Sequence, residues 1–318
     1  MRRRVGLVFG GCIGAAVAGQ ARINGALGER LQDGVAAAVI SFGAGLVVLL
    51  IAFGASGRLR VGLGRVRVAL RAGGLRWWQL LGGLCGAFFV ACQGLTVGAI
   101  GVTAFTVAVV AGQLVSSLVV DRFGLGPGGR TPVTGLRAGG AGLALVAVAL
   151  AAVGRADSGG GLAVPEALRG GPQALLIGLP LLAGLGVAWQ QAVNGRVGAV
   201  GGPLSATLAN FTTGLAGLLI VETAVVTRTG WPTAFPREPW LYLGGVVGVA
   251  FIALAVVTVR WIGVLLLGLT TVAGQLLMSL VLDVLTPSGP GLSATAVVGC
   301  ALTFAAVALA ARAPARAA

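Results

Sequence analysis

Long apolar runs separated by short polar or arginine-bearing segments make up most of the chain. A membrane core of about 30 Å is crossed by about 20 helical residues, and apolar runs of this length recur along the sequence. The pattern predicts an all-α integral membrane protein with ten transmembrane helices. They are expected over residues 5–26, 34–54, 78–98, 100–120, 134–153, 173–194, 204–226, 240–259, 262–282 and 293–311.

One apolar run is too long for a single crossing. No charged residue occurs from Gln79 to Val120, a stretch of 42 residues. As one straight helix it would be about 63 Å long, roughly twice the membrane core. We therefore expect two antiparallel helices with a tight turn near Gly98 to Gly101, and a matching turn at Arg260 and Trp261 in the second half.

Composition excludes several classes of function. With 57% hydrophobic and 9% charged residues, the chain is not a water-soluble enzyme. Its net charge of +14 comes from arginines between apolar runs, which indicates membrane topology and no nucleic-acid partner. Histidine is absent and the four cysteines form no C-x-x-C pair, so no His-based catalytic triad, metal site or cofactor is expected.

Arginine counts in alternate loops predict the orientation. Sixteen arginines fall on the side of the N-terminus and five on the other side, with Arg22 inside the first helix. Because cytoplasmic loops are enriched in positive charge, both termini are expected in the cytoplasm, with the protein in the plasma (inner) membrane. The stretch from Arg58 to Arg76 is expected to be a topology-setting loop. An amphipathic segment lying on anionic headgroups is the less favoured alternative.

The chain repeats itself internally. Residues 78–121 align without a gap on residues 240–283, and both copies contain A-G-Q-L followed by S-L-V-x-D. The first helix also has a counterpart, since Gln20 and Asn24-Gly match Gln190 and Asn194-Gly. We expect one five-helix repeat over 1–153, an external linker over 154–172 and a second repeat over 173–318. Because five is odd, the two repeats should be inverted in the membrane.

These motifs resemble the YdcZ-like branch of the drug/metabolite transporter superfamily. The resemblance rests on Q-x-x-x-N-G in the first helix of each repeat and A-G-Q-L in the fourth, and it covers nearly the whole chain. It implies a ten-helix carrier in which helices one to four and six to nine surround a central cavity. Helices five and ten are expected to pack outside.

Polar residues inside the spans are the candidates for solute binding, because polar groups in lipid are costly and usually face a protein interior or a wet cavity. Helix–helix packing remains open as the alternative role. The substrate-binding candidates are Gln20, Asn24, Gln113, Ser117, Gln190, Asn194, Asn210, Gln275 and Ser279.

Three acidic residues are candidates for proton coupling. Glu222 lies inside the seventh span, and Asp121 and Asp283 close the two A-G-Q-L helices. An intramembrane carboxylate can carry a proton through a transport cycle. For Glu222 the open alternative is an interfacial carboxylate that snorkels or pairs with Arg22 or Arg228. For the two aspartates it is helix-end hydrogen bonding or pairing with an arginine.

The expected function is secondary active transport of a small organic metabolite or drug by alternating access, with proton coupling as an option. Export is what the resemblance implies. The partners are the solute and the lipid bilayer, and a homodimer is left open. A channel or lipid-translocating protein on the same inverted-repeat scaffold is the alternative.

Overall fold

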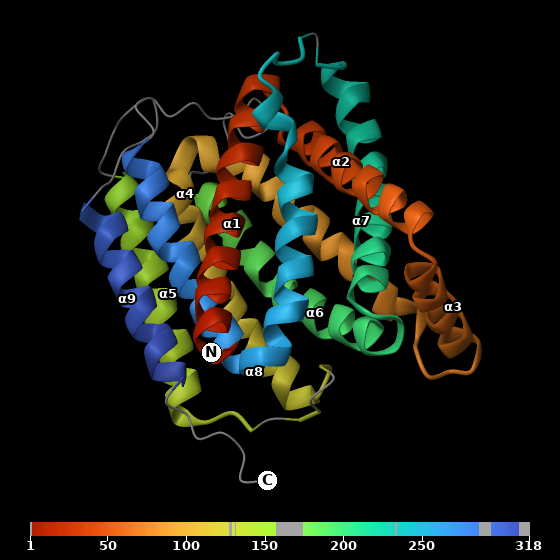
Figure 1. Cartoon of the computed structure of the whole chain (residues 1–318). Helices are drawn as coiled ribbons and strands as arrows, with labels where there is room; N and C mark the ends of the chain where they lie inside the picture. Colours follow the sequence, from red (N-terminus) through yellow and green to blue (C-terminus); the bar gives the residue numbers. More distant parts are fainter. Residues whose placement is uncertain are drawn as a thin grey trace.

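The computed structural model describes residues 2–126, 129–130, 132–156, 174–232, 234–285 and 294–311, and each regular element within them is a helix (Figure 1). The α-helices are α1 (Arg2–Leu31), α2 (Gly34–Ala55), α3 (Gly57–Arg71), α4 (Gly82–Phe123), α5 (Gly135–Ala156), α6 (Ala174–Gly201), α7 (Pro203–Thr229), α8 (Gly244–Val284) and α9 (Ala294–Ala311). The 3₁₀ turns η1 (Trp77–Leu81) and η3 (Pro239–Tyr242) precede α4 and α8.

The described helices are apolar enough for a membrane protein. Five helical segments have the length and composition of membrane spans: Arg4–Leu31, Gly34–Ala55, Trp77–Phe123, Ala174–Gly201 and Pro203–Arg228. Shorter apolar helical stretches cover Gly135–Leu150, Thr270–Val284 and Val297–Leu309. The chain is therefore an all-helical, multi-pass membrane protein.

The corner between α1 and α2 is fixed by a local cap. Gln32 adopts a positive φ of 53°, which ends α1, and Asp33 is the N-cap of α2. Its carboxylate accepts hydrogen bonds of 2.9 Å from the backbone N–H groups of both Val35 and Ala36. These bonds satisfy two of the amides that a helix start leaves without an intrahelical partner.

The long helix α4 consists of two legs joined at Gly101. This residue has φ 78° and ψ 163°, a conformation that glycine adopts without a Cβ clash. The ring centroids of Phe89 and Phe105 are 5.7 Å apart. In a straight helix 16 residues would separate them by about 24 Å, so the chain folds back at Gly101, where the uncharged run predicts its turn.

α8 folds back in the same way. Gly248 at its start packs against Gln20 of α1, whereas Thr270, Thr271 and Gly274 pack near Gly10, Gly14 and Gly11 of the same helix. In a straight α8, Gly248 and Thr270 would be about 33 Å apart. Their contacts on α1, Gln20 and Gly10, are only about 15 Å apart along that helix. The reversal therefore lies between Gly248 and Thr270. The side chains of Arg260 and Trp261, predicted at this turn, lie outside those described.

Equivalent helices of the two repeats make equivalent contacts. The two most extensive helix pairs are α1 with α8 and α4 with α6, and the repeat relates one pair to the other. α2 packs against its own equivalent α7, and the Phe42 and Phe211 rings lie with centroids 4.9 Å apart. α5 likewise pairs with α9 at one edge of the bundle (Figure 1). Each repeat thus completes its packing with the other.

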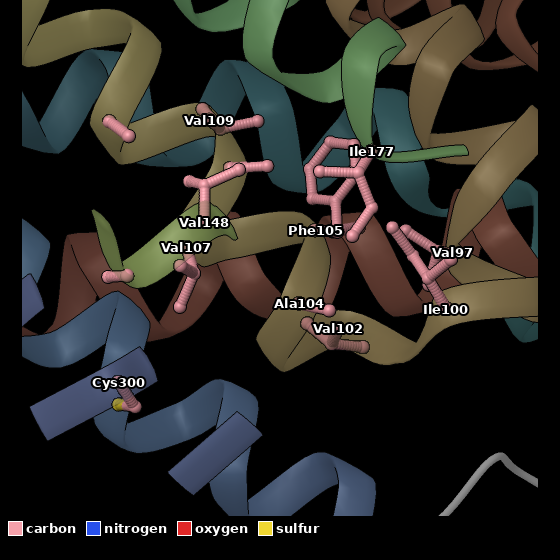
Figure 2. Close-up of a cluster of buried hydrophobic side chains, with 14 of the residues drawn as sticks. Val97, Ile100, Val102, Ala104, Phe105, Val107, Val109, Val148, Ile177 and Cys300 are labelled. Carbon is pink, nitrogen blue, oxygen red and sulfur yellow. The ribbon is translucent and has the colours of Figure 1, made fainter. Parts of the chain in front are cut away.

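The largest apolar cluster surrounds the second leg of α4. Phe105 and Val107 of this leg, Val148 of α5, Ile177 of α6 and Cys300 of α9 are all buried in it (Figure 2). Small and β-branched side chains dominate the leg, so the neighbouring helices can approach closely. Helices from both repeats therefore share one core.

The expectation of a plain loop between the second and third spans is wrong. Residues 57–71 form the helix α3, and residue Val66 is buried against Val197 of α6 and Ala206 of α7. The backbone of Gly62 approaches the carbonyl of Gly201 so closely that a Cβ would overlap it. Packing of this apolar face against α6 and α7 stabilises a helix that the high arginine content obscured.

Candidate functional site

Polar side chains gather where α1, α2 and α4 meet the start of α8. Gln20 donates from Nε2 to the carbonyl of Gly244 at 2.8 Å, and Asn24 donates from Nδ2 to Oε1 of Gln93 at 2.6 Å. Ser41 of α2 lies against Gly244 together with Asn24. We call Gln20, Asn24, Ser41 and Gln93 the first amide cluster. All four are buried, so the cluster is closed to solvent in this state.

The first amide cluster is not satisfied by its own members. In the part of the chain that the structure describes, Oδ1 of Asn24, Oγ of Ser41 and Nε2 of Gln93 have no hydrogen-bond partner. A buried polar atom without a partner costs about 1–3 kcal/mol. The cluster therefore has free capacity both to donate and to accept hydrogen bonds.

The equivalent cluster of the second repeat is closed by one side chain. Asn210 of α7 occupies the position equivalent to Ser41, and its Oδ1 accepts from Nε2 of Gln190 at 2.8 Å and from Nδ2 of Asn194 at 2.9 Å. We call Gln190, Asn194 and Asn210 the second amide cluster. It lies at the start of α4, whereas the first cluster lies at the start of α8. We call these two contact regions, where the amides of one repeat meet the start of a helix of the other, the joints.

Glycines make these joints possible. A Cβ on Gly244 would overlap Oδ1 of Asn24, and one on Gly82 would lie 2.7 Å from Oδ1 of Asn194. One helical turn later, Gly248 faces Nε2 of Gln20 and Gly86 faces Nε2 of Gln190. The repeated glycines therefore seat the amides of one repeat against a helix of the other.

Gln93 is the functional candidate that sequence reasoning missed. It has no exposed surface and connects α4 to Asn24, yet its equivalent in the second repeat is Ala255. Because repeated motifs point to most of the candidates, an unrepeated glutamine does not stand out. The signal is nevertheless present, since Gln93 lies in the middle of the uncharged run, where an amide side chain is costly unless it faces a protein interior or a wet cavity.

The predicted glutamine pair of the A-G-Q-L motifs lies apart from both amide clusters. The glycine before each glutamine packs on the first helix of the other repeat: Gly112 on Leu181 of α6, and Gly274 on Gly11 of α1. Ser117 and Ser279 donate to the carbonyls of Leu114 and Leu276 within their own helices. The structure therefore brings Gln20 with Asn24, and Gln190 with Asn194 and Asn210, but leaves Gln113 and Gln275 at separate helix crossings.

Asp283 caps a helix that lies 180 residues away in the sequence. Its Oδ1 accepts from the backbone N–H of Val102 and its Oδ2 from that of Thr103, both at 2.8 Å. These amides start the second leg of α4 immediately after Gly101, where they have no intrahelical partner. Asp283 is buried, and it therefore fastens the end of α8 to the turn of α4.

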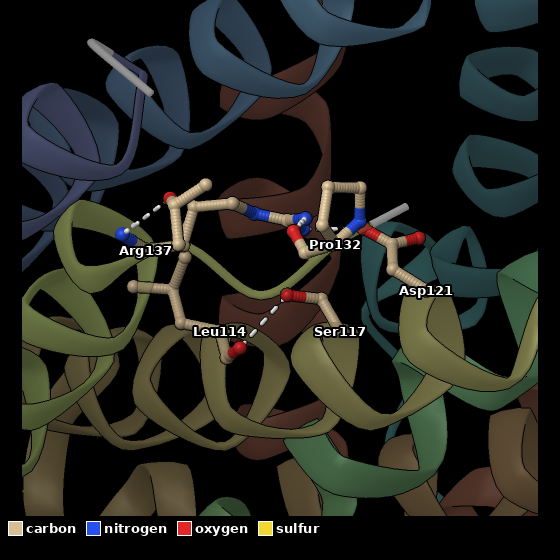
Figure 3. Close-up of polar contacts among 6 residues, drawn as sticks. Leu114, Ser117, Asp121, Pro132 and Arg137 are labelled. Carbon is tan, nitrogen blue, oxygen red and sulfur yellow. Dashed lines mark hydrogen bonds and ion pairs between the residues drawn. The ribbon is translucent and has the colours of Figure 1, made fainter. Parts of the chain in front are cut away.

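Asp121, the equivalent aspartate, has a different partner. Its Oδ2 forms an ion pair with Nη2 of Arg137 at the start of α5 (Figure 3). Arg137 also donates to the carbonyl of Pro132, and its backbone N–H reaches Oγ1 of Thr134. α9 has no arginine within Ala294–Ala311, so this pairing belongs to the first repeat.

Glu222 is buried in α7 without a hydrogen-bond partner. Only 3% of the residue is exposed, and in the described part of the chain neither carboxylate oxygen accepts a hydrogen bond. The predicted alternative of an ion pair with Arg22 or Arg228 is therefore not found there. Of the three acidic candidates, Glu222 is the one whose oxygens are not engaged in holding helices together.

Neither metal binding nor a disulfide is indicated within the described residues. These residues contain no group of three or more Cys, Asp and Glu residues able to hold a metal ion. Cys12, Cys85, Cys92 and Cys300 are unpaired. The site is built from amides, hydroxyls and a few carboxylates.

Comparison with protein families gives a match over both repeats. The sequence profile of the family described as "Putative inner membrane exporter, YdcZ" matches residues 5–150 and 175–309. The comparison with curated proteins finds no match.

Comparison with solved structures gives the same architecture. One crystal structure, described only as that of a protein, is 19% identical to this chain. The alignment covers 97% of this chain and 96% of the other, with a TM-score of 0.53. At this identity the likeness concerns the fold alone.

Proposed function

Because the chain belongs to the YdcZ family of the drug/metabolite transporter superfamily, we propose that it exports a small organic solute by alternating access. The family is described as "Putative inner membrane exporter", which supports a role in membrane transport. The observation that carries the mechanism is that the repeats make reciprocal contacts. The amides of the first repeat pack against α8 of the second, and the amides of the second pack against α4 of the first. Two halves related by inversion in the membrane and joined by equivalent contacts can rock between an inward-facing and an outward-facing state.

The proposed membrane arrangement has ten crossings. Each leg of α4 and each leg of α8 crosses once, and α3 lies at the membrane surface. Residues 1–153 and 173–318 then form inverted five-helix repeats joined by an external linker over 154–172. The fold-backs of α4 and α8 support this arrangement, because each converts one long helix into two antiparallel legs.

The two aspartates supply a switch between the states. Asp283 now caps the second leg of α4, while Asp121 pairs with Arg137. In the opposite state the roles exchange, with Asp121 capping the second leg of α8 and Asp283 released. The repeated S-L-V-x-D motif supports this exchange, since it provides both ends of the molecule with the same capping carboxylate.

The solute is proposed to be neutral or zwitterionic. The candidate binding residues are amides and hydroxyls: Gln20, Asn24, Gln113, Ser117, Gln190, Asn194, Asn210, Gln275 and Ser279, now with Gln93. Such groups bind polar uncharged chemistry without the desolvation cost of an unpaired charge. The unsatisfied atoms of the first amide cluster support solute contact there once the joint opens.

Glu222 is the proposed proton-coupling residue. A coupling group must bind and release a proton during the cycle, and the carboxylate of Glu222 is free of partners that would hold it in one form. Asp283 is a weaker candidate because both its oxygens bind backbone amides.

Flux measurement tests the function. Metabolites that differ between cells with and without the gene are identified first and then offered to proteoliposomes containing the purified protein. The expected result is accumulation against a concentration gradient that collapses when an uncoupler is added. Flux that only equilibrates the two sides would contradict secondary active transport, and scrambling of labelled phospholipid would favour lipid translocation.

The topology has its own test in a cysteine-free background. Gly64→Cys, on the exposed face of α3, should be protected from a membrane-impermeant thiol reagent in intact cells, and Ser158→Cys in the linker should be labelled. Gly64 suits this purpose because a Cβ there meets no other atom within 4 Å. The reverse labelling pattern would invert the proposed orientation.

A further inference from the structure

The helix α3 presents a charged surface that the packing of the bundle does not use. Five arginines, at positions 58, 60, 65, 67 and 71, fall within its 15 residues. No acidic residue occurs from Gly34 to Val120, so the surrounding sequence offers these arginines no carboxylate. A strongly basic helix without acidic neighbours in sequence needs its counter-charge from elsewhere.

The faces of α3 divide sharply. Gly62 and Val66 face α6 and α7, as described above, and anchor the helix. Val61 and Val68, seven residues apart, lie together on an opposite face and are 56% and 66% exposed. At 3.6 residues per turn, Arg65 lies on one side of this valine line, and Arg67 and Arg71 lie on the other. An exposed apolar line is therefore flanked by arginines on both sides.

The arginines differ in what they contact. Arg60 donates from Nη1 to the carbonyl of Gly54 at 2.9 Å and so caps the end of α2. Arg65, Arg67 and Arg71 are exposed, and no described residue forms a hydrogen bond or ion pair with their side chains. Their charges are available to a ligand outside the protein.

A neighbouring aromatic residue fits the same surface. Trp77, which begins η1 just after α3, is 71% exposed. Tryptophan is enriched at the headgroup level of membranes, where its ring is apolar and its N–H is wet. Arginine side chains with exposed valines between them are likewise typical of helices that lie in the membrane interface.

We propose that α3 is a docking surface for anionic phospholipid. Val61 and Val68 enter the boundary between headgroups and acyl chains, and Arg65, Arg67 and Arg71 bind the phosphates of lipids with net negative charge. Charge complementarity favours this occupant, because guanidinium groups bind phosphate oxygens in a bidentate manner and none of the described carboxylates pairs with these three arginines. α3 follows α2 of the first repeat and packs on α6 and α7 of the second, so the helix that binds the lipid contacts both repeats.

Lipid binding to the purified protein tests the proposal without any transport assay. Native mass spectrometry would measure the Kd for phosphatidylglycerol and for phosphatidylcholine separately. Each arginine near an anionic surface contributes about a few-fold in affinity, so wild type should prefer phosphatidylglycerol by about tenfold or more. The triple variant Arg65→Gln, Arg67→Gln, Arg71→Gln should bind both lipids equally.

Two matched variants decide whether the lipid preference belongs to this surface of α3. The triple change Arg122→Gln, Arg228→Gln, Arg237→Gln removes the same charge from other exposed positions and should keep the preference. The triple change of Arg65, Arg67 and Arg71 to Lys keeps the charge but not the bidentate geometry, so it should retain part of the preference, which separates loss of charge from misfolding. A preference retained by the Gln triple variant of α3, or lost equally in the control or the Lys variant, would overturn the proposal.

Discussion

The two amide clusters carry the same motif but solve its hydrogen bonding differently. In the second repeat, Oδ1 of Asn210 accepts from both Gln190 and Asn194. In the first repeat, Ser41 at the equivalent position is too short to do this, and Gln93 binds Asn24 from another helix instead. Three polar atoms are left over in the first cluster. Both repeats thus pack their amides against a helix of the other repeat, but only the second cluster satisfies them within itself, whereas the first has free hydrogen-bonding capacity.

The capping aspartates differ in a parallel way. Asp283 is buried and holds two backbone amides, whereas Asp121 has a side chain that is 37% exposed and pairs with Arg137. A partly exposed ion pair contributes little to stability, about 0–1 kcal/mol. The two repeats therefore share the motif, but the aspartate of the second repeat is held by stronger interactions than the aspartate of the first.

The largest effect is expected from removing the buried cap. Asp283→Ala leaves the amides of Val102 and Thr103 without partners and should lower the free energy of unfolding by about 3 kcal/mol. Asp121→Ala should lower it by less than about 1 kcal/mol. Reversible unfolding of the detergent-solubilised protein measures both. Equal losses would mean that the two ends are closed equally firmly.

The self-contained cluster should depend on one side chain. Asn210→Ser removes the shared acceptor from Gln190 and Asn194 and is expected to cost about 2 kcal/mol, at roughly 1 kcal/mol for each hydrogen bond. The same unfolding measurement applies. Asn210→Leu keeps the size of the side chain, removes the acceptor and adds no charge, so it should cost about as much as Asn210→Ser; stability close to wild type would show that packing, not hydrogen bonding, is responsible.

Converting the first cluster into a copy of the second should have the opposite sign. Ser41→Asn combined with Gln93→Ala recreates the residue set of the second repeat and removes two of the three unsatisfied atoms, Oγ of Ser41 and Nε2 of Gln93. A gain of about 1 kcal/mol in unfolding free energy is expected. If the first cluster contacts solute, the same variant should lose flux although it is more stable. Unchanged flux would assign the first cluster to helix packing alone.

The two A-G-Q-L glutamines should matter for flux more than for stability. Gln113→Ala and Gln275→Ala are each expected to reduce transport in proteoliposomes while lowering unfolding free energy by less than about 1 kcal/mol, the usual scale for a hydrogen bond between membrane helices. Loss of folded protein in detergent in either variant would instead indicate a packing role for that glutamine.

The smallest effect on stability is expected at Glu222. Glu222→Gln keeps the shape and hydrogen-bonding capacity but removes the titration, so the fold should be retained. Accumulation driven by a proton gradient should be lost, while exchange of solute between two filled sides continues. Normal proton-driven accumulation by the folded variant would exclude Glu222 and turn attention to Asp121 and Asp283.

Sequence reasoning succeeded where a pattern has one physical solution. An uncharged run twice the membrane thickness must fold back, and Gly101 is where it does so. At α3 it favoured a plain loop over an amphipathic segment, because the contacts that bury Val66 against α6 and α7 are not visible in the local sequence. Gln93 and the cap by Asp283 depend on contacts 69 and 180 or more residues apart, and no local pattern encodes such distances.

The pairing of α1 with α8 also constrains how the protein is made. As the chain leaves the ribosome, α1 enters the membrane more than 200 residues before the helix that receives Gln20 has been synthesised. Until then its amide side chains need temporary partners, which water, lipid headgroups or the insertion machinery can provide. In a nascent chain stopped before α8, α1 should therefore be packed less stably. Such an incomplete chain should be a better substrate for membrane proteases than the finished protein.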